Sequence, residues 1–125
     1  YTANWLTEHL KQVLEPFGIT PTQFNILRIL RGSKKPISTL NIRERMLDRM
    51  SDTSRLVDRL VAKGYVDKKV ALSDKRLVDI TITQKGLDLL ANIDAIQYQL
   101  DNLAANLSSN EAAQLNYLLD KMRNL

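Results

Sequence analysis

The sequence predicts a mainly α-helical protein with one small β-hairpin. Apolar residues recur three or four positions apart through most of the 125 residues, which is the spacing of a helix face. Two short runs near the middle, residues 65–72 and 77–82, alternate apolar and polar residues as strands do. A charged Ser-Asp-Lys-Arg segment joins these two runs and is expected to form the hairpin tip.

Two helices are expected in the first third of the chain. The first lies within residues 2–18 and ends where a proline and a glycine interrupt the pattern. The second begins after Thr20, which caps it together with Gln23 in a capping box, and Gly32 is expected to end it. The expected inward faces are Trp5, Leu6, Leu10, Val13 and Leu14 in the first helix and Phe24, Leu27, Ile29 and Leu30 in the second.

A short helix and a second, capped helix then follow each other closely. The short helix covers residues 39–47, and the second covers residues 51–64 with Ser51 or Asp52 as its cap. The expected inward faces are Leu40, Ile42, Met46 and Leu47 in the short helix and Leu56, Val57, Leu60 and Val61 in the second. This order is the helix-turn-helix pattern, and a hairpin directly after it makes a winged helix-turn-helix.

The remainder of the chain predicts two more helices. Thr83 caps a long helix that runs to residue 107, and Ser108 with Glu111 forms a capping box for the last helix. In the long helix, apolar residues repeat at steps of three and four as in a coiled coil: Ile93, Ile96, Leu100, Leu103 and Leu107. The last helix is expected to face inward through Leu115, Leu118, Leu119 and Met122.

Residues 1–125 are expected to form a single domain. A winged-helix region spans about residues 20–90, and residues 1–16 and 84–125 supply helices for dimerisation. These helices carry more apolar surface than one small domain needs, and two copies related by a two-fold axis would read DNA half-sites about 34–36 Å apart. The alternative is that these helices pack only on their own core.

The composition excludes several kinds of site. Apolar residues make up 44% and charged residues 26%, and no run of about 18 apolar residues could span a membrane. No signal peptide is visible, so a cytoplasmic location is expected. Cysteine is absent and His9 is the only histidine, which argues against a disulfide or a transition-metal site. No cofactor motif or catalytic set appears either, and an enzyme is not expected.

The net charge of +4 is unevenly distributed. Residues 43–76 hold ten Lys or Arg against six Asp or Glu, whereas residues 77–125 hold three against six. A basic middle suggests a polyanionic partner for that region. The alternative is a basic surface that only interacts with solvent.

The second helix of the helix-turn-helix has the composition of a DNA-reading element. In a winged helix, its N-terminal half enters the major groove and the hairpin reaches an adjacent minor groove. Hydroxyls there can bind phosphates or base edges, and an arginine can bind guanine through two hydrogen bonds. The face opposite the apolar one shows Thr53, Ser54, Arg55, Asp58 and Arg59, with Asp52 at the start. The alternative is a solvated face with weak ion pairing.

The hairpin tip also has two interpretations, a DNA contact or an ordinary solvated turn. Asp74 is a common turn residue, and Lys75 and Arg76 would suit a surface that needs only solubility. Beside a helix-turn-helix, however, a basic arm favours contact with phosphates or with the minor groove. Asp74 is expected to orient the guanidinium of Arg76.

Three stretches resemble the multiple-antibiotic-resistance regulator family, MarR: TPTQFNILRILRG, ERMLDRMSDTSRLVDRLVAKGYVDKK and SDKRLVDITITQKGLDLL. The resemblance implies a homodimer that binds pseudo-palindromic double-stranded operator DNA, usually as a repressor that a small ligand releases. It assigns DNA contacts to Asp52, Thr53, Ser54, Arg55 and Arg59 in the helix and to Lys75 and Arg76 in the wing. The first helix of the motif departs from the family because it carries Arg43 and Arg45, which are expected to contact the DNA backbone or to pair with Glu44 and Asp48.

The resemblance also implies a pocket between the dimerisation helices and the winged helix, suited to an aromatic or anionic effector. Its candidate lining is Trp5, Phe17, Phe24, Arg28, Tyr98 and Tyr117. The alternative is that these aromatic residues belong to the core. An alternative function is a winged-helix module that binds another protein without DNA, and an exposed apolar patch near the wing would favour it.

Overall fold

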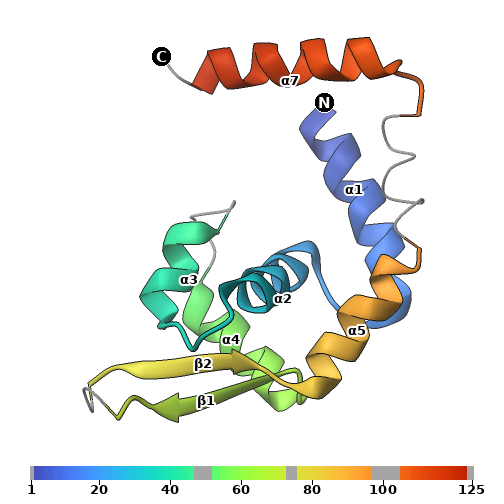
Figure 1. Ribbon diagram of the computed structural model, residues 1–125. Coiled ribbons are helices and arrows are strands. Elements are labelled where there is room, and N and C mark those ends of the chain that lie inside the picture. Colours follow the sequence, from blue (N-terminus) through green and yellow to red (C-terminus); the bar gives the residue numbers. More distant parts are fainter. Residues whose placement is uncertain (1, 47–51, 73–75, 97–104, 124–125) are drawn as a thin grey trace.

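The computed structural model describes residues 2–46, 52–72, 76–96 and 105–123. Helices dominate the fold, and a single hairpin projects from one side (Figure 1). The elements are α1 (Thr2–Leu14), the 3-10 turn η1 (Glu15–Phe17), α2 (Pro21–Ser33), α3 (Thr39–Arg45), α4 (Thr53–Ala62), β1 (Val66–Val70), β2 (Val78–Ile82), α5 (Gln84–Asp94) and α7 (Ser109–Arg123). The predicted mainly α fold with a β-hairpin wing is therefore confirmed.

The two strands form an antiparallel hairpin in which Val66 lies opposite Ile82 and Val70 lies opposite Val78. A third segment joins them, because the backbone N–H of Ile80 donates to the carbonyl of Ile37 over 2.9 Å. This bridge fixes the start of the wing against the segment between α2 and α3. The alternation predicted for residues 77–82 is confirmed, since Ile80 is fully buried and Val78 and Ile82, on the same face, pack against the core.

The core lies between α2, α3, α4 and the hairpin, and it extends to α5 and the end of α1. Its fully buried large side chains are Leu14, Ile26, Leu27, Ile42, Leu60, Ile80, Leu90 and Ile93. The helices α2, α4 and α5 each contribute several buried residues at helical spacing, so each turns one apolar face toward the core. Burying these apolar side chains is the main favourable term in folding.

The predicted helix caps are confirmed. Thr20 and Gln23 form a reciprocal capping box at the start of α2. The carboxylate of Asp52 accepts from the backbone N–H of Arg55 and caps α4, and Ser51, the other expected cap, lies outside the described residues. These side chains satisfy backbone donors that a helix leaves open in its first turn, each stabilising by about 1 kcal/mol.

The junction of α4, β2 and α5 is held by a threonine and a glycine. The hydroxyl of Thr83 donates to the carbonyl of Gly64 over 2.7 Å and accepts from the backbone N–H of Gly86. A Cβ on Gly86 would lie 2.4 Å from the carbonyl oxygen of Tyr65. A side chain at residue 86 would therefore push the first turn of α5 away from the end of α4.

Two helix ends differ from the prediction. Gly32 lies inside α2, and the left-handed residue that ends this helix is Lys34, with φ 59°. The helix expected to run to residue 107 ends at Asp94, and residues 105–107 form a turn instead. Of the expected seam, Ile93 is buried and Leu107 lies in that turn, whereas Leu100 and Leu103 lie outside the described residues.

Several apolar residues expected to face inward are exposed. Leu40 in α3 and Val61 in α4 lie at the edges of their apolar faces and reach solvent. The largest departure is α7, in which no residue is buried. Its four apolar residues expected to face inward are all exposed: Leu115, Leu118, Leu119 and Met122. Figure 1 shows why, because α7 extends away from the winged-helix part at the end where the N-terminus lies.

Within the parts of the chain that the structure describes, no helix is both long and apolar enough to cross a bilayer.

Candidate nucleic-acid interface

The polar face of α4 is built on its N-cap. Asp52 Oδ1 accepts from the backbone N–H of Arg55 over 3.3 Å, which fixes the first turn of the helix. From this turn, Val57 and Leu60 point into the core. The opposite face presents exposed Ser54, Arg55, Asp58 and Arg59. The predicted separation of a buried and a polar face is therefore present.

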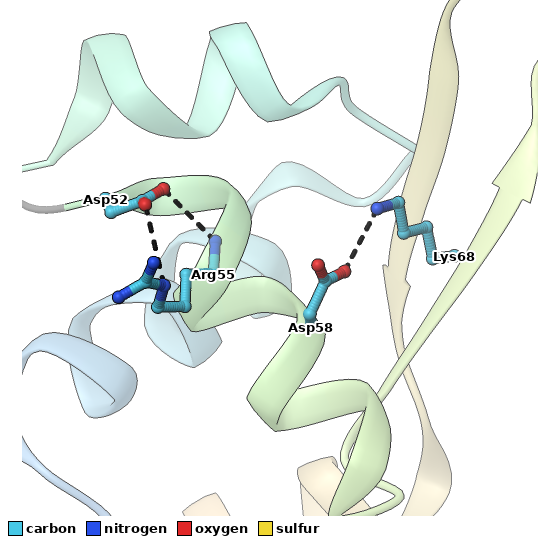
Figure 2. A network of polar contacts seen from close by, with 4 residues as sticks. All are labelled: Asp52, Arg55, Asp58 and Lys68. Carbon is cyan, nitrogen blue, oxygen red and sulfur yellow. Dashed lines mark hydrogen bonds and ion pairs between the residues drawn. The ribbon is translucent and has the colours of Figure 1, made fainter.

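Arg55 is the cation nearest the start of α4. Its Nε lies 3.8 Å from Asp52 Oδ2, and the two side chains are 72% and 61% exposed. Figure 2 shows the guanidinium beside the carboxylate of the cap residue. An ion pair this long and this exposed is weak. The guanidinium can therefore leave Asp52 for a base edge at little cost in free energy.

A second ion pair joins α4 to the wing. Lys68 Nζ donates to Asp58 Oδ1 over 3.0 Å. The strand register explains the contact, because Lys68 lies opposite Ile80 and therefore on the side of the hairpin that faces the helices. Figure 2 shows the lysine reaching from the strand across to α4. The buried side chains shared by α4 and the hairpin hold these elements together, and this exposed ion pair adds a small contribution.

Thr53 was expected on the exposed face of α4, but the structure buries it. Its side chain is only 4% exposed, and its hydroxyl oxygen has no hydrogen-bond partner among the residues that the structure describes. The cause is helical spacing, since Thr53 precedes Val57 by four positions and Leu60 by seven, which places all three on one face. Thr53 therefore does not belong to the exposed face on which it was expected, and its assignment as a DNA contact stays a prediction.

The wing tip is only partly described. Asp74 and Lys75 lie outside the described residues, and Arg76 is exposed at the start of the return strand segment. The expected orientation of Arg76 by Asp74 thus stays a prediction. On β1, Lys69 is exposed and lies opposite Asp79, so its charge is offset by an acid on the neighbouring strand.

Two further cations lie on α3. Arg43 and Arg45 are exposed in the last turn of that helix, next to exposed Glu44. Asp48, the other expected partner, lies outside the described residues. Whether these arginines contact DNA or pair with acids stays a prediction.

Lys68 contacts the polar face of α4, and the sequence analysis did not single it out. The sequence could have indicated this contact, because strand alternation puts Lys68 on the same face as Val66 and Val70. A lysine at this position can reach an acid on the helix that packs beside the strand. Asp58, in the middle of the preceding helix, is that acid.

The residues predicted to line an effector pocket have different surroundings in the structure. Phe24 is 7% exposed and belongs to the core, with Arg28 placed 5.5 Å above its ring. Trp5 contacts His9 with ring centroids 4.5 Å apart on α1. Phe17 packs partly against the core, Tyr117 is exposed on α7, and Tyr98 lies outside the described residues. The core alternative therefore fits Phe24 and Phe17, and a pocket formed by these six residues stays a prediction.

Among the described residues, no cluster of three His, Cys, Asp or Glu side chains could hold a metal ion. A shifted acidity is found at the start of α7. There the hydrogen bonds from the backbone and side chain of Ser108 lower the pKa of the exposed Glu111 carboxyl.

Comparison with known proteins places this arrangement in a known group. Residues 17–77, which include α2, α3, α4 and β1, match the model of the MarR family. The multiple antibiotic resistance protein MarR of Escherichia coli is 30% identical over 115 residues, which cover 90% of this chain and 79% of that protein. The transcriptional repressor MprA of Escherichia coli is 24% identical over 94% of this chain and 68% of its own.

The fold agrees with a solved structure of the same group. A mutant MarR from Escherichia coli, crystallised in complex with operator DNA, superposes with a TM-score of 0.87 at 28% identity. The superposition covers 97% of this chain and 87% of that one, so it includes the helices on both sides of the winged helix. The chain therefore belongs to the MarR family of transcription regulators and is not an enzyme, as the sequence predicted.

Proposed function

We propose that this chain is a cytoplasmic, homodimeric repressor that binds pseudo-palindromic operator DNA and is released by a small ligand. The observation that carries the proposal is the exposed Ser54, Arg55 and Arg59 face of α4, which lies beside a hairpin whose Lys68 contacts Asp58. Major-groove reading requires an amphipathic helix with free polar side chains, and minor-groove contact requires a cationic arm next to it. Operator binding by the related MarR supports this assignment.

The individual contacts follow from chemistry. Arg55 is assigned to a guanine edge, because a guanidinium can donate two parallel hydrogen bonds there. Ser54 and Arg59 are assigned to phosphates or base edges, and the N-terminus of α4 adds backbone N–H groups for a phosphate. In the wing, Lys75 and Arg76 are assigned to the minor groove.

The dimer is supported by the apolar face of α7. This 15-residue helix buries none of its residues, and Leu115, Leu118 and Met122 remain exposed. An isolated helix of this length is marginal in water, and most helical stability comes from packing an apolar face. A second copy supplies that packing and also presents a second α4 for the other half of an operator.

Release by a ligand rests on the family and not on a described pocket of aromatic residues. The chain has no cysteine, so an oxidisable thiol cannot act as its switch. A small molecule bound to the protein itself is the remaining route to regulation that we propose.

One observation favours a second candidate function, a winged-helix module for another protein. Val70, Leu72 and Leu77 on the wing are exposed, and Leu72 is fully so. A partner protein would bury such residues. They are, however, interspersed with Lys68, Lys69 and Arg76, which suits a polyanion better than an apolar partner.

DNA binding measured by fluorescence anisotropy separates the two functions. The probe is the intergenic duplex that flanks the chain's own gene, titrated across about 50 to 200 mM salt. Phosphate contacts predict a steep linear fall of log affinity with log salt. The Arg55→Ala variant should bind about tenfold or more weakly and lose preference at one base pair, because one bidentate contact contributes about 1–3 kcal/mol.

The matched control is Lys121→Ala on α7, which removes a cation far along the chain from α4 and should leave the affinity unchanged. Salt-independent binding, or equal effects of both variants, would reject the DNA-reading role of α4. Loss of affinity without a change in base preference would reject only the assignment of Arg55 to a base.

A further inference from the structure

The carboxylate of Asp52 makes two contacts with a single residue, Arg55 (Figure 2). Its Oδ1 accepts from the backbone N–H of Arg55 over 3.3 Å, and its Oδ2 lies 3.8 Å from Nε of the same arginine. The first contact is the N-cap of α4, so the helix backbone fixes where the carboxylate lies. The second contact therefore places a fixed negative charge beside the guanidinium.

The ion pair uses only one part of the guanidinium. It is made through Nε, and within the described ranges neither Nη group of Arg55 hydrogen-bonds to another residue. A guanidinium donates from a planar fork, and the edge of guanine takes two parallel donors through O6 and N7. The two Nη groups can supply these donors while Nε stays beside Asp52, so binding a guanine does not require the pair to separate.

The attraction between the two side chains should differ between the free chain and a DNA complex. In the free chain the pair is weak, because the Arg55 and Asp52 side chains are 72% and 61% exposed. A duplex on the same face removes water from both side chains, and the attraction of opposite charges grows as the surrounding dielectric constant falls. The acid should therefore act on Arg55 mainly in the complex.

Capping alone does not explain an acid at the start of α4. Serine and asparagine cap a helix about as well as aspartate does. A carboxylate on a face that meets DNA repels phosphates, so it lowers the affinity for a duplex of any sequence. A negative charge that weakens binding and is not needed as a cap has an explanation if it directs the neighbouring cation.

We propose that Asp52 is a positioning residue that sets the base preference of Arg55. It holds the Nε side of the guanidinium, so the two Nη groups meet a guanine edge and not the phosphates beside it. Without this charge, Arg55 is free to bind a phosphate, which every sequence offers. Asp52 thus lowers affinity and raises specificity. The inference rests on the proposed function, in which Arg55 reads a base in the major groove.

A carboxylate can also read a base by itself, because it can accept from the amino group of cytosine. The geometry favours the indirect role. The helix backbone already uses Oδ1 of Asp52, and Oδ2 would have to turn away from Arg55 to accept from a cytosine.

Asp52→Ser is the test variant, because serine keeps a helix cap and removes the charge. The probe is the intergenic duplex that flanks the chain's own gene, with each base pair of the protected region substituted in turn. A scrambled duplex of equal length measures binding that is independent of sequence. Asp52→Ser should lower the preference at the base pair that Arg55→Ala affects by about fivefold or more, since a bidentate contact carries such discrimination. Affinity for the scrambled duplex should rise severalfold, and an unchanged base preference would overturn the proposal.

A purely structural role predicts a different result. A weakened cap would lower the thermal midpoint of unfolding and would weaken binding to operator and scrambled duplexes alike, with the base preference retained. The proposal expects an unchanged midpoint in Asp52→Ser and opposite changes on the two duplexes. An equal loss of affinity on both duplexes would overturn the positioning role.

Asp58→Asn is the matched control for charge. It removes one negative charge from the same exposed face of α4, but Asp58 contacts Lys68 and not Arg55. It should strengthen binding to both duplexes and leave the base preference unchanged. An equal loss of preference in Asp58→Asn and Asp52→Ser would show a general effect of charge and would contradict a role specific to Asp52.

A double-mutant cycle separates the indirect role from direct reading. If Asp52 acts through Arg55, Asp52→Ser should leave every base preference unchanged when it is made in the Arg55→Ala variant. A further change of preference at any base pair in that variant would mean that the carboxylate reads a base itself, and the positioning role would then be wrong.

The salt dependence gives an independent readout. Once Arg55 binds a phosphate, the slope of log affinity against log salt on the scrambled duplex should become steeper by about one. An unchanged slope would overturn the transfer of Arg55 to a phosphate. A parent chain that binds neither duplex would overturn the proposed function and the role of Asp52 with it. Failure of the Asp52→Ser predictions alone would overturn only the role of Asp52, because Arg55→Ala tests the proposed function separately.

Discussion

The winged-helix part and the C-terminal helix differ in what surrounds their apolar residues. In the winged helix, Leu27, Leu60 and Ile80 are fully buried. In α7, Leu115 and Leu118 are 46% and 51% exposed, although they follow the same helical spacing. Figure 1 shows the winged-helix elements grouped around one another, with α7 extending away from them. The apolar faces of the winged helix are buried within one chain, whereas the apolar face of α7 is exposed.

The difference shows a limit of the helical sequence pattern: it predicts an apolar face but not the surface that buries this face. An amphipathic face specifies that a helix will be covered, but it does not specify whether the covering surface belongs to the same chain. For α2 and α4 the same chain provides it. For α7 the proposed second copy provides it, and the residues expected to face inward are then the residues of an interface.

The largest expected effect comes from truncating matched leucines in the two regions. Leu60→Ala should lower the free energy of unfolding by about 2–5 kcal/mol at any protein concentration, because it leaves a cavity in a core within one chain. Leu118→Ala should instead lower the midpoint of unfolding most at low protein concentration, where the weakened dimer dissociates. Urea unfolding at two widely separated protein concentrations measures both effects.

A concentration-independent midpoint for the unmodified chain and for Leu118→Ala would contradict the comparison. In that case α7 would be stable without a second copy. Analytical ultracentrifugation of the same two variants provides the control, since Leu60→Ala should keep the oligomeric state and Leu118→Ala should shift it toward the monomer.

The second prediction concerns the tightest contact in the winged-helix part. Gly86→Ala should destabilise the chain by about 1–3 kcal/mol, because the new Cβ would lie 2.4 Å from the carbonyl oxygen of Tyr65. Gly32→Ala is the matched control, since no atom lies within 4 Å of a Cβ there and the residue is inside α2. It should stabilise by about 0.5–1 kcal/mol. Thermal unfolding measures both, and changes of the same sign would contradict the close approach of α5 to α4.

The sequence could predict features that depend on neighbours along the chain. Thr20 with Gln23, Asp52 and Thr83 act within one helical turn, so their residue types and spacing were sufficient. The buried position of Thr53 was also encoded by its spacing to Val57, but the preference of threonine for helix starts and DNA contacts outweighed that signal.

Contacts between distant segments could not be predicted in this way. Arg31 and Asp94 are 63 positions apart, and only the folded chain brings them to 2.8 Å. The end of α2 depends on a similar contact, because Ile37 must reach Ile80 and the turn before it falls on Lys34 and not on Gly32. The surroundings of α7 depend on a second chain, about which helical periodicity carries no information.

The third prediction concerns Lys34, a residue of the winged-helix part with a left-handed backbone conformation. Lys34→Gly should stabilise the chain by about 1 kcal/mol relative to Lys34→Ala, because glycine adopts a φ of 59° without the clash of a Cβ. Both variants lose the same charge, so their difference isolates the backbone. Thermal unfolding measures it, and equal stability of the two variants would contradict the left-handed conformation.

The smallest expected effect lies at the start of α7. Ser108 N donates to Glu111 Oε1 over 2.9 Å, and this bond lowers the pKa of the Glu111 carboxyl below its ordinary value. A carboxyl whose pKa is lower in the folded state contributes stability above its unfolded pKa and loses it as the pH falls through the folded pKa. Acidification should therefore fray the first turn of α7, while the neutral amide in Glu111→Gln should remove this pH dependence.

Carbon NMR shifts of the Glu111 carboxyl and of the α7 backbone, followed from neutral to acid pH, measure this loss. Because the group is exposed, the effect should be confined to the first turn and should leave the winged-helix signals unchanged. A second chain packed on α7 would stabilise the helix without its cap, so the fraying should grow as the protein is diluted. Fraying that is independent of protein concentration would show that the cap and the apolar face of α7 act separately, and it would weaken the contrast between the two regions.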